Sequence, residues 1–254
     1  MLSKNIVSVI KTKDYFYPHN PPYNPSQLYS ELNNIKISKE NNYVYDSIRR
    51  LLYEYGLDED NFNSIYWNPF KEFVKPGNTI VLKPNFVTHY NHARFIDGTT
   101  DMNCVVTHGS VIRCVLDYVA LALKGDGKVI ITDCPIQGTD WDKLLSIIGI
   151  AEIKEDFKKR FPNIDLLVKD FRLGKAKIIG RTIISRETDE SKKDSFYEID
   201  IGENSLLLPL MPGKCEFGVS QYSKRRMMHA HTPLNNKYLI PKEIINADFF
   251  INLP

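Results

Sequence analysis

The sequence predicts an α/β fold with a mainly parallel, doubly wound sheet, and three consecutive segments support this prediction. Residues 79–83 form a run of β-favouring residues that is typical of a strand buried on both faces. Apolar residues at helical spacing follow between residues 107 and 124, and Gly125 closes that segment. Residues 128–133 are a second apolar run. A strand, a helix and a strand in this order predict two parallel strands of one sheet.

The other elements follow from the same two patterns, apolar alternation for strands and helical spacing for helices. The predicted helices cover residues 41–55, 66–74, 140–150 and 152–161, and further strands of the sheet are expected at 164–170 and 248–252. Residues 5–11 are consistent with a first strand that could join this sheet. From residue 174 onward short apolar runs alternate with charge-rich turns, at 178–185, 196–201 and 206–210. This texture predicts an antiparallel excursion near residues 178–210.

Two regions are expected along the chain. Residues 1–66 hold the first strand, an arm rich in proline and tyrosine, and a helix, all packed on the core, and residues 67–254 form the α/β domain. The connection between residues 86 and 104 is long for a compact unit, and loops of this length are more often functional or disordered than idle. This loop carries His89, His92, Arg94 and Asp97.

Composition excludes several classes of protein. An apolar content of 43% with 25% charged residues is ordinary for a globular protein with a real core. The formal net charge of +2 creates no global field that would recruit nucleic acid or an anionic membrane. No apolar run approaches the roughly 20 residues that cross a bilayer, and no secretory leader is recognisable. We therefore expect a cytoplasmic protein that binds neither nucleic acid nor membrane.

The cysteines offer no metal or cluster motif. Cys104, Cys114, Cys134 and Cys215 are scattered without a Cys-x-x-Cys spacing, so we expect free thiols. Walker, dinucleotide-binding, nucleophile-elbow and His-Glu-x-x-His motifs are also absent from the sequence. No cofactor is identified by these patterns.

The ends of the two predicted strands carry the strongest candidate site. Lys83, Asn85 and Asp133 share the carboxyl edge of the sheet, where α/β folds bind ligands. Lys83 can bind a phosphate or carboxylate or act as a base, and Asn85 offers a donor and an acceptor beside it. Asp133 can hold a metal ion or a sugar hydroxyl. We predict that Lys83 and Asp133 are catalytic and lie in one cavity. The alternatives are a surface lysine and a helix-capping aspartate.

Weaker candidates lie near this edge. Thr107, His108 and Ser110 open the helix after the first strand, where free backbone N–H groups favour an anion. Gln137 follows the second strand. We list these four as ligand-binding residues, with ordinary helix capping and a structural histidine as the alternatives.

A metal site is a further, weak candidate. His229 and His231 would lie on one face of a strand, a spacing compatible with a divalent metal. The basic run Lys224, Arg225 and Arg226 precedes them, and such runs are usually solvated faces. The need for a metal stays open.

The residues around the candidate site also resemble a family. Lys83-Pro84-Asn85 at a strand end, residues 107–113 at a helix start and residues 133–137 after a strand are similar to the bacterial and archaeal family catalogued as "domain of unknown function 362". Residues 238–241 and 247–254 extend the resemblance, which covers the chain from residue 67 onward. It implies the α/β fold but no reaction.

Members of that family continue beyond the position of Leu253-Pro254 with a Lys-x-Lys-Thr-His segment and further helices. This sequence stops there, on an apolar strand. We therefore expect a truncated form whose site lacks a contribution from the absent segment.

Two functions follow from the sequence. The first is an α/β enzyme or ligand-binding domain for a small anionic metabolite, either a carboxylate or a phosphorylated sugar. The second is a non-catalytic protein-interaction scaffold that uses the tyrosine-rich arm and the basic run at residues 224–226. Neither the reaction nor the oligomeric state is fixed by the residues.

Overall fold

A computed structural model describes residues 6–12, 16–93, 101–180, 182–210, 224–232 and 234–254. The chain divides into two units by its internal contacts. The first unit comprises Met1–Pro135, Thr139–Asp170 and Ala247–Pro254, and the second comprises Ile136–Gly138 and Phe171–Asn246. The arm and helix before residue 66 therefore belong to the same unit as the central strands.

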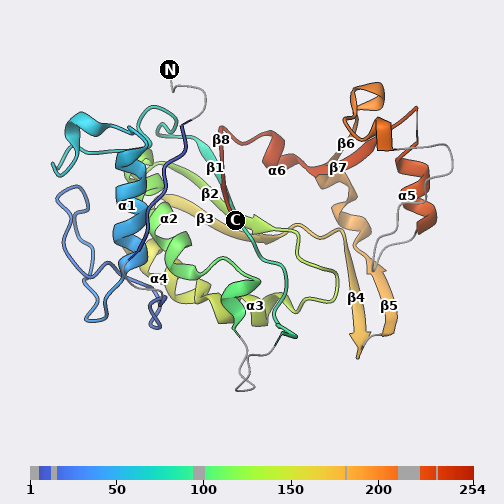
Figure 1. Ribbon diagram of the computed structural model, residues 1–254, viewed down its shortest axis with the longest axis horizontal. Coiled ribbons are helices and arrows are strands. Elements are labelled where there is room, and N and C mark those ends of the chain that lie inside the picture. Colours follow the sequence, from blue (N-terminus) through green and yellow to red (C-terminus); the bar gives the residue numbers. More distant parts are fainter. Residues whose placement is uncertain (1–5, 13–15, 94–100, 181, 211–223, 233) are drawn as a thin grey trace. The chain divides into compact units, whose positions relative to one another are not determined.

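A four-stranded parallel sheet organises the first unit, with the order β3-β2-β1-β8 (Figure 1). Its strands are β1 (Thr79–Pro84), β2 (Gly127–Asp133), β3 (Ile164–Asp170) and β8 (Phe249–Leu253). Leu82 of the central strand lies opposite Ile131 on one side and Ile251 on the other. The α/β class and the mainly parallel sheet are confirmed, and neither end of any of these four strands differs from its predicted position by more than one residue.

The helices of this unit cover one face of the sheet. They are α1 (Tyr43–Glu54), α2 (Gly109–Leu123), α3 (Trp141–Ile148) and α4 (Ile150–Arg160), with short 3-10 turns at Glu59–Asn61 and Met102–Cys104. Their buried side chains form one cluster with Ile80 and Leu82 of β1 and with Val129 and Ile131 of β2. Alternate strand residues point to opposite faces, so these four strand side chains mark the face that the helices cover.

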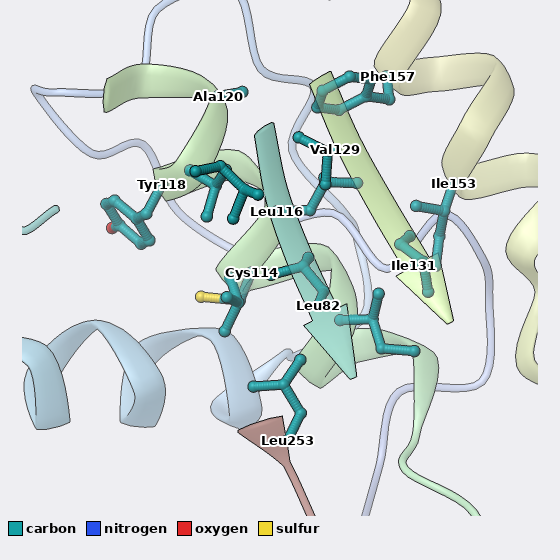
Figure 2. Close-up of a cluster of buried hydrophobic side chains, with 14 of the residues drawn as sticks. Leu82, Cys114, Leu116, Tyr118, Ala120, Val129, Ile131, Ile153, Phe157 and Leu253 are labelled. Carbon is teal, nitrogen blue, oxygen red and sulfur yellow. The ribbon is translucent and has the colours of Figure 1, made fainter. Parts of the chain in front are cut away.

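The centre of the core lies between α2, α4 and the two middle strands (Figure 2). Leu82, Leu116, Val129 and Phe157 have no exposed surface, and Ile131 is 1% exposed. Val81 and Ile130, which point to the opposite face, are also buried, at 0% and 2% exposed. Strands buried on both faces read as continuous apolar runs, which explains why both were recognisable from sequence. The core fixes where the strands end, and hence where Lys83 and Asp133 lie.

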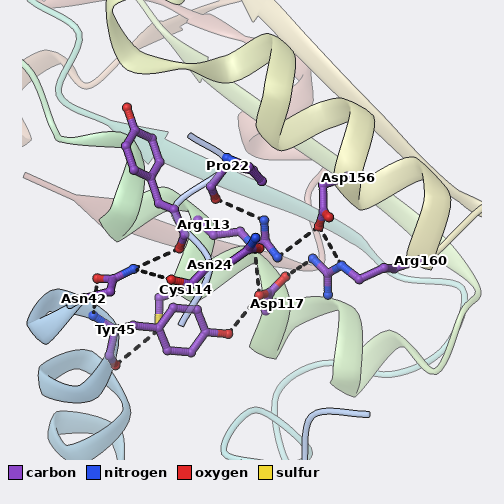
Figure 3. A network of polar contacts seen from close by, with 10 residues as sticks. Pro22, Asn24, Asn42, Tyr45, Arg113, Cys114, Asp117, Asp156 and Arg160 are labelled. Carbon is purple, nitrogen blue, oxygen red and sulfur yellow. Dashed lines mark hydrogen bonds and ion pairs between the residues drawn. The ribbon is translucent and has the colours of Figure 1, made fainter. Parts of the chain in front are cut away.

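The N-terminal arm packs on this core. Tyr23 and Tyr29 are 4% and 8% exposed and belong to the same cluster. Figure 3 shows how the arm is tied down: the Asn42 side chain donates to the carbonyls of Tyr23 and Asn24, at 2.9 and 3.1 Å. Asn42 also caps α1, because its side chain accepts from the Tyr45 N–H. One buried amide therefore joins the start of α1 to the arm.

A buried network of charges joins α2 to α4 and α1 (Figure 3). Arg113 and Asp117 have no exposed surface and pair at 2.9 Å. Asp117 also accepts from the Tyr45 hydroxyl at 2.8 Å and pairs with Arg160. Asp156 closes the network by pairing with Arg113 at 2.9 Å and Arg160 at 2.8 Å. Two arginines and two aspartates balance to zero, which permits their burial.

The second unit consists of two small antiparallel pairs and short helices. β4 (Gly174–Ile179) pairs with β5 (Thr182–Thr188), and β6 (Phe196–Asp200) pairs with β7 (Lys237–Pro241). The helices are α5 (Lys224–Ala230) and α6 (Lys242–Ile245), with 3-10 turns at Glu190–Ser195, Gly202–Asn204 and Leu208–Leu210. The predicted antiparallel excursion is therefore present. The predicted single strand at 178–185 is instead a hairpin that turns at Gly180 with φ +61°, and the strand predicted at 206–210 is wrong.

Two elements predicted in the first unit are also wrong. Residues 6–12 form no strand, and Val7 and Val9 are 82% and 84% exposed. Apolar alternation over a short window predicts a strand only when a ladder partner is available, and this segment pairs with none of the described strands. Residues 66–74 form successive turns rather than a helix. Pro69 has no N–H to donate and disfavours helical geometry at Asn68.

Candidate functional site

Lys83 and Asp133 meet at the carboxyl edge of the parallel sheet. The Lys83 Nζ lies 3.1 Å from Asp133 Oδ1, and the two side chains are 33% and 10% exposed. Lys83 is the next-to-last residue of β1, and Asp133 is the last of β2. The proximity that the strand-end argument predicted is therefore present in the structure. Their shared cavity and catalytic roles stay predictions.

Internal donors hold the Asp133 carboxylate in place. Oδ1 accepts from the Cys134 N–H at 2.8 Å as well as from Lys83, and Oδ2 accepts from the Phe86 N–H at 2.6 Å. These bonds fix the turn after β2 to the chain that leaves β1. Charge-assisted bonds of this kind are stronger than neutral ones. Asp133 therefore has a structural role: it positions Lys83 and the segments that follow β1 and β2.

Lys83 retains capacity for a ligand. Its ammonium group donates to the Pro84 carbonyl at 3.2 Å and faces Asp133, which accounts for two of its three hydrogens. A third of its side chain is open to solvent. A small anion can approach that remaining donor without breaking the ion pair.

Thr107 is hydrogen-bonded to the backbone at the carboxyl edge of the sheet. Its hydroxyl accepts from the Asn85 N–H at 2.7 Å and donates to the Leu253 carbonyl at 2.6 Å. Its own N–H donates to the Asn85 carbonyl at 2.9 Å. The segment before α2 thus crosses the ends of β1 and β8. The Asn85 side chain, by contrast, makes no hydrogen bond to any described residue.

His108 and Ser110 form the N-terminal cap of α2. His108 Nδ1 accepts from the Ser110 N–H at 3.1 Å and lies 2.8 Å from the Ser110 hydroxyl. The His108 ring stacks on Tyr17 and packs against Tyr23. A Cβ at Gly109 would lie 2.2 Å from the Ile148 carbonyl, so this helix start is closely covered. The packing accounts for these residues structurally, and their ligand role stays a prediction.

The environment of His108 makes a testable prediction about pH. Burial, and then the nearby His19, lower the pKa of His108 to about 4, against the opposing effects of Asp101 and Glu40. As pH falls from about 6.5 toward 4, the unfolded chain binds a proton that the folded chain excludes. Stability is therefore lost in that window. Because the ring is partly exposed, we expect His108 to contribute about 1 to 2 kcal/mol of this loss.

The His108→Asn variant provides the matched control. Asparagine keeps the capping acceptor but does not titrate. Urea denaturation between pH 7 and pH 4 should show a shallower loss of stability in the variant than in the unchanged protein. Parallel curves for the two proteins would show that His108 does not titrate differently on folding.

Gln137 belongs to the second unit. Its side chain is buried and its Oε1 has no hydrogen-bond partner among the described residues. Its backbone carbonyl accepts from the Arg172 guanidinium at 3.2 Å and from the Ala176 N–H at 3.1 Å. Gln137 thus anchors the start of β4 in its own unit. Its proposed part in ligand binding stays a prediction.

The predicted strand geometry of the histidine pair is wrong. His229 lies in the last turn of α5, and His231 follows the helix in an isolated bridge to Asn236. The His231 ring packs against Tyr238 at 5.1 Å. No group of three or more potential metal ligands occurs among the described residues. Side chains of two members of the preceding basic run, Lys224 and Arg226, lie outside the described part.

The loop after β1 is partly described. His89 Nδ1 accepts from the Asp140 N–H at 2.9 Å, and the Tyr90 ring packs against the rings of both His89 and His92. Asp140 caps α3, so this contact fastens the loop to that helix. Arg94, Asp97 and Cys215 lie outside the described residues. The other three cysteines form no disulfide bond, as predicted.

One residue near the site was not selected from the sequence. Asn252 lies opposite Lys83 in the β1–β8 pair and is exposed. Its position follows from the register of two parallel strands that are distant in sequence. The only sequence signal is a polar residue near the end of an apolar run, the same signal that identifies Lys83.

Comparisons with known proteins supply no further constraint. No family model matches the chain, and neither a curated protein nor a solved structure matches it. The resemblance to "domain of unknown function 362" therefore stays a prediction. Among the described helices, none combines the length and apolarity that a bilayer crossing requires.

Proposed function

We propose that the first unit binds a small anionic metabolite, a carboxylate or a phosphorylated sugar, at the carboxyl edge of its parallel sheet. The observation that carries this proposal is the Lys83 side chain, which is one-third exposed and whose ammonium group lies 3.1 Å from Asp133 at the strand ends. Open α/β sheets bind ligands at this edge. A lysine there acts as a point charge for phosphate or carboxylate.

Neighbouring amides add specificity to this site. Asn85 follows Lys83 by two residues in an extended segment, and Asn252 is the residue opposite Lys83 on β8. Both side chains carry donors for anionic oxygens and acceptors for hydroxyl groups. The combination suits a ligand with a charged group and an adjacent hydroxyl. In this arrangement Lys83 contacts the ligand and Asp133 is a positioning residue.

The Lys83→Met variant tests the proposal. Methionine keeps most of the side-chain length and removes the charge, so we expect it to abolish anion binding with less than about 1 kcal/mol change in stability. Melting curves with inorganic phosphate, D-lactate and glucose 6-phosphate identify the ligand class. A ligand at about 100 times its Kd stabilises the folded form by about 2.7 kcal/mol.

Lys128→Met is the matched control for this experiment. Lys128 also lies on the parallel sheet and faces an acidic partner, Asp165 at 3.9 Å, but it lies near the start of β2. Its loss should leave the ligand effect intact. Equal losses in both variants would show a general charge effect, and the absence of any ligand-induced shift would contradict the proposed site.

A second candidate is a protein-interaction scaffold, and one surface favours it. An apolar groove of about 710 Å³ lies beside the edge strand β8, lined among others by Tyr55, Phe70, Phe73 and Phe250. Phe250 is 39% exposed. Exposed apolar grooves at a sheet edge are suited to protein contacts. A scaffold of this kind would show no melting shift with any of the three anions.

A further inference from the structure

A separate cleft of about 610 Å³ lies near the start of β1, at the opposite end of that strand from Lys83. Its walls come from residues 65–76 and from the last turn of α2. The volume falls within the range of about 300 to 1,000 Å³ that is usual for small-molecule sites. The cleft is therefore large enough for a ligand of one aromatic ring and its substituents.

One wall of the cleft is apolar. Its accessible surface includes Ile65, which is 62% exposed, whereas Trp67 and Ala122 lie behind that surface with at most 2% exposed. The Trp67 indole N–H is already used, because it donates to the Leu57 carbonyl at 3.0 Å. At the rim Tyr66 remains 74% exposed despite its size. These residues favour a flat apolar body in the cleft.

The rim of the cleft carries more positive than negative charge. Lys71, Lys75 and Lys124 line it, against one carboxylate, Glu72. The Lys71 ammonium is engaged by Asp58, and that of Lys75 by the Lys71 carbonyl. The Lys124 ammonium makes no hydrogen bond or ion pair with any described residue. Lys124 is thus the cation that remains available to an acidic group of a ligand.

A buried acceptor completes the set of contacts. Asn68 Oδ1 has almost no exposed surface and no hydrogen-bond donor among the described residues, although Asn68 lines the cleft. A buried acceptor without a donor is costly. A hydroxyl or N–H group on the ligand would satisfy it.

We propose that this cleft binds a small hydroxylated aromatic acid. The carboxylate pairs with Lys124, the ring packs on the apolar wall, and the hydroxyl donates to Asn68. The three contacts are independent, so a ligand lacking either polar group binds more weakly. This site is distinct from the proposed anion site at Lys83.

Binding of 4-hydroxybenzoate, benzoate and phenol, followed by the NMR signal of the Trp67 indole N–H, tests the proposal. The chain has two tryptophans, and the Trp141→Phe variant leaves the Trp67 indole N–H as a single signal in a two-dimensional ¹H–¹⁵N spectrum. Titration with 4-hydroxybenzoate should shift that signal saturably. Benzoate lacks the donor and phenol lacks the charge, so each should bind about fivefold or more weakly.

The Lys124→Asn variant tests the cation. Lys124 has a φ of +51°, in the left-handed region that asparagine tolerates. The variant should bind 4-hydroxybenzoate about fivefold more weakly, whereas the Lys128→Asn and Lys83→Met variants should bind it unchanged. An unshifted Trp67 signal at millimolar 4-hydroxybenzoate would overturn the proposal. So would equal binding of the three probes, or an Lys124→Asn variant that binds as tightly as the unchanged protein.

Discussion

Replacing Asp117 with alanine is expected to lower the free energy of unfolding by about 3 to 5 kcal/mol. Burial raises the pKa of this carboxyl, but the ion pairs with Arg113 and Arg160 outweigh burial and hold the pKa below its usual value. Without Asp117, only Asp156 remains to balance two arginines of which one is fully buried. The free energy of unfolding falls because a buried positive charge is left without a partner, and not only because an attraction is lost.

Two milder variants make this prediction specific. Tyr45→Phe removes only the hydroxyl that donates to Asp117 and should cost about 1 kcal/mol. Glu155→Ala breaks an ion pair with Lys159 on the same helix as Asp156, but both side chains are more than two-thirds exposed, at 69% and 68%. That change should leave the free energy of unfolding almost unchanged, because solvent screens an exposed pair. Chemical denaturation measures all three variants, and an Asp117→Ala effect no larger than that of Glu155→Ala would contradict the role assigned to the network.

The parallel strands were predictable because each is a short, mainly apolar run with a polar residue at its end or next to its end. The same reasoning located Lys83 beside Asp133, since parallel strands end at one edge. The buried network was not predictable. Arg113 and Asp117 are four residues apart on a helix, a spacing that equally describes a solvated ion pair. Their burial depends on the arm, α1 and α4, which local periodicity does not place.

The wrong predictions have a similar cause. The apolar alternation at residues 6–12 satisfies the strand pattern, but no described strand pairs with it. His229 and His231 have the spacing of one strand face, yet the residues before them form a helix. The local sequence pattern was therefore enough to predict those elements that are continuous apolar runs. It failed where tertiary partners decide the conformation.

Asp133→Ala is expected to destabilise the first unit by about 2 to 4 kcal/mol. The Asp133 carboxylate accepts from two backbone N–H groups, and that of Phe86 belongs to a residue with no exposed surface. Alanine would leave this donor buried without a partner and would also release Lys83. A residue whose only task is to act on a ligand would cost little stability when removed.

Comparison with Lys83→Met separates the structural from the chemical contribution of the pair. Lys83 is one-third exposed, so its loss should cost less than about 1 kcal/mol, and the double variant should be almost as unstable as Asp133→Ala alone. Urea denaturation of the two single variants and the double variant supplies the cycle. If Asp133→Ala proves as stable as the unchanged protein, its bonds to the strand exits contribute nothing to folding. The carboxylate would then be retained for chemistry at the sheet edge, and the catalytic role predicted from sequence would gain over the positioning role.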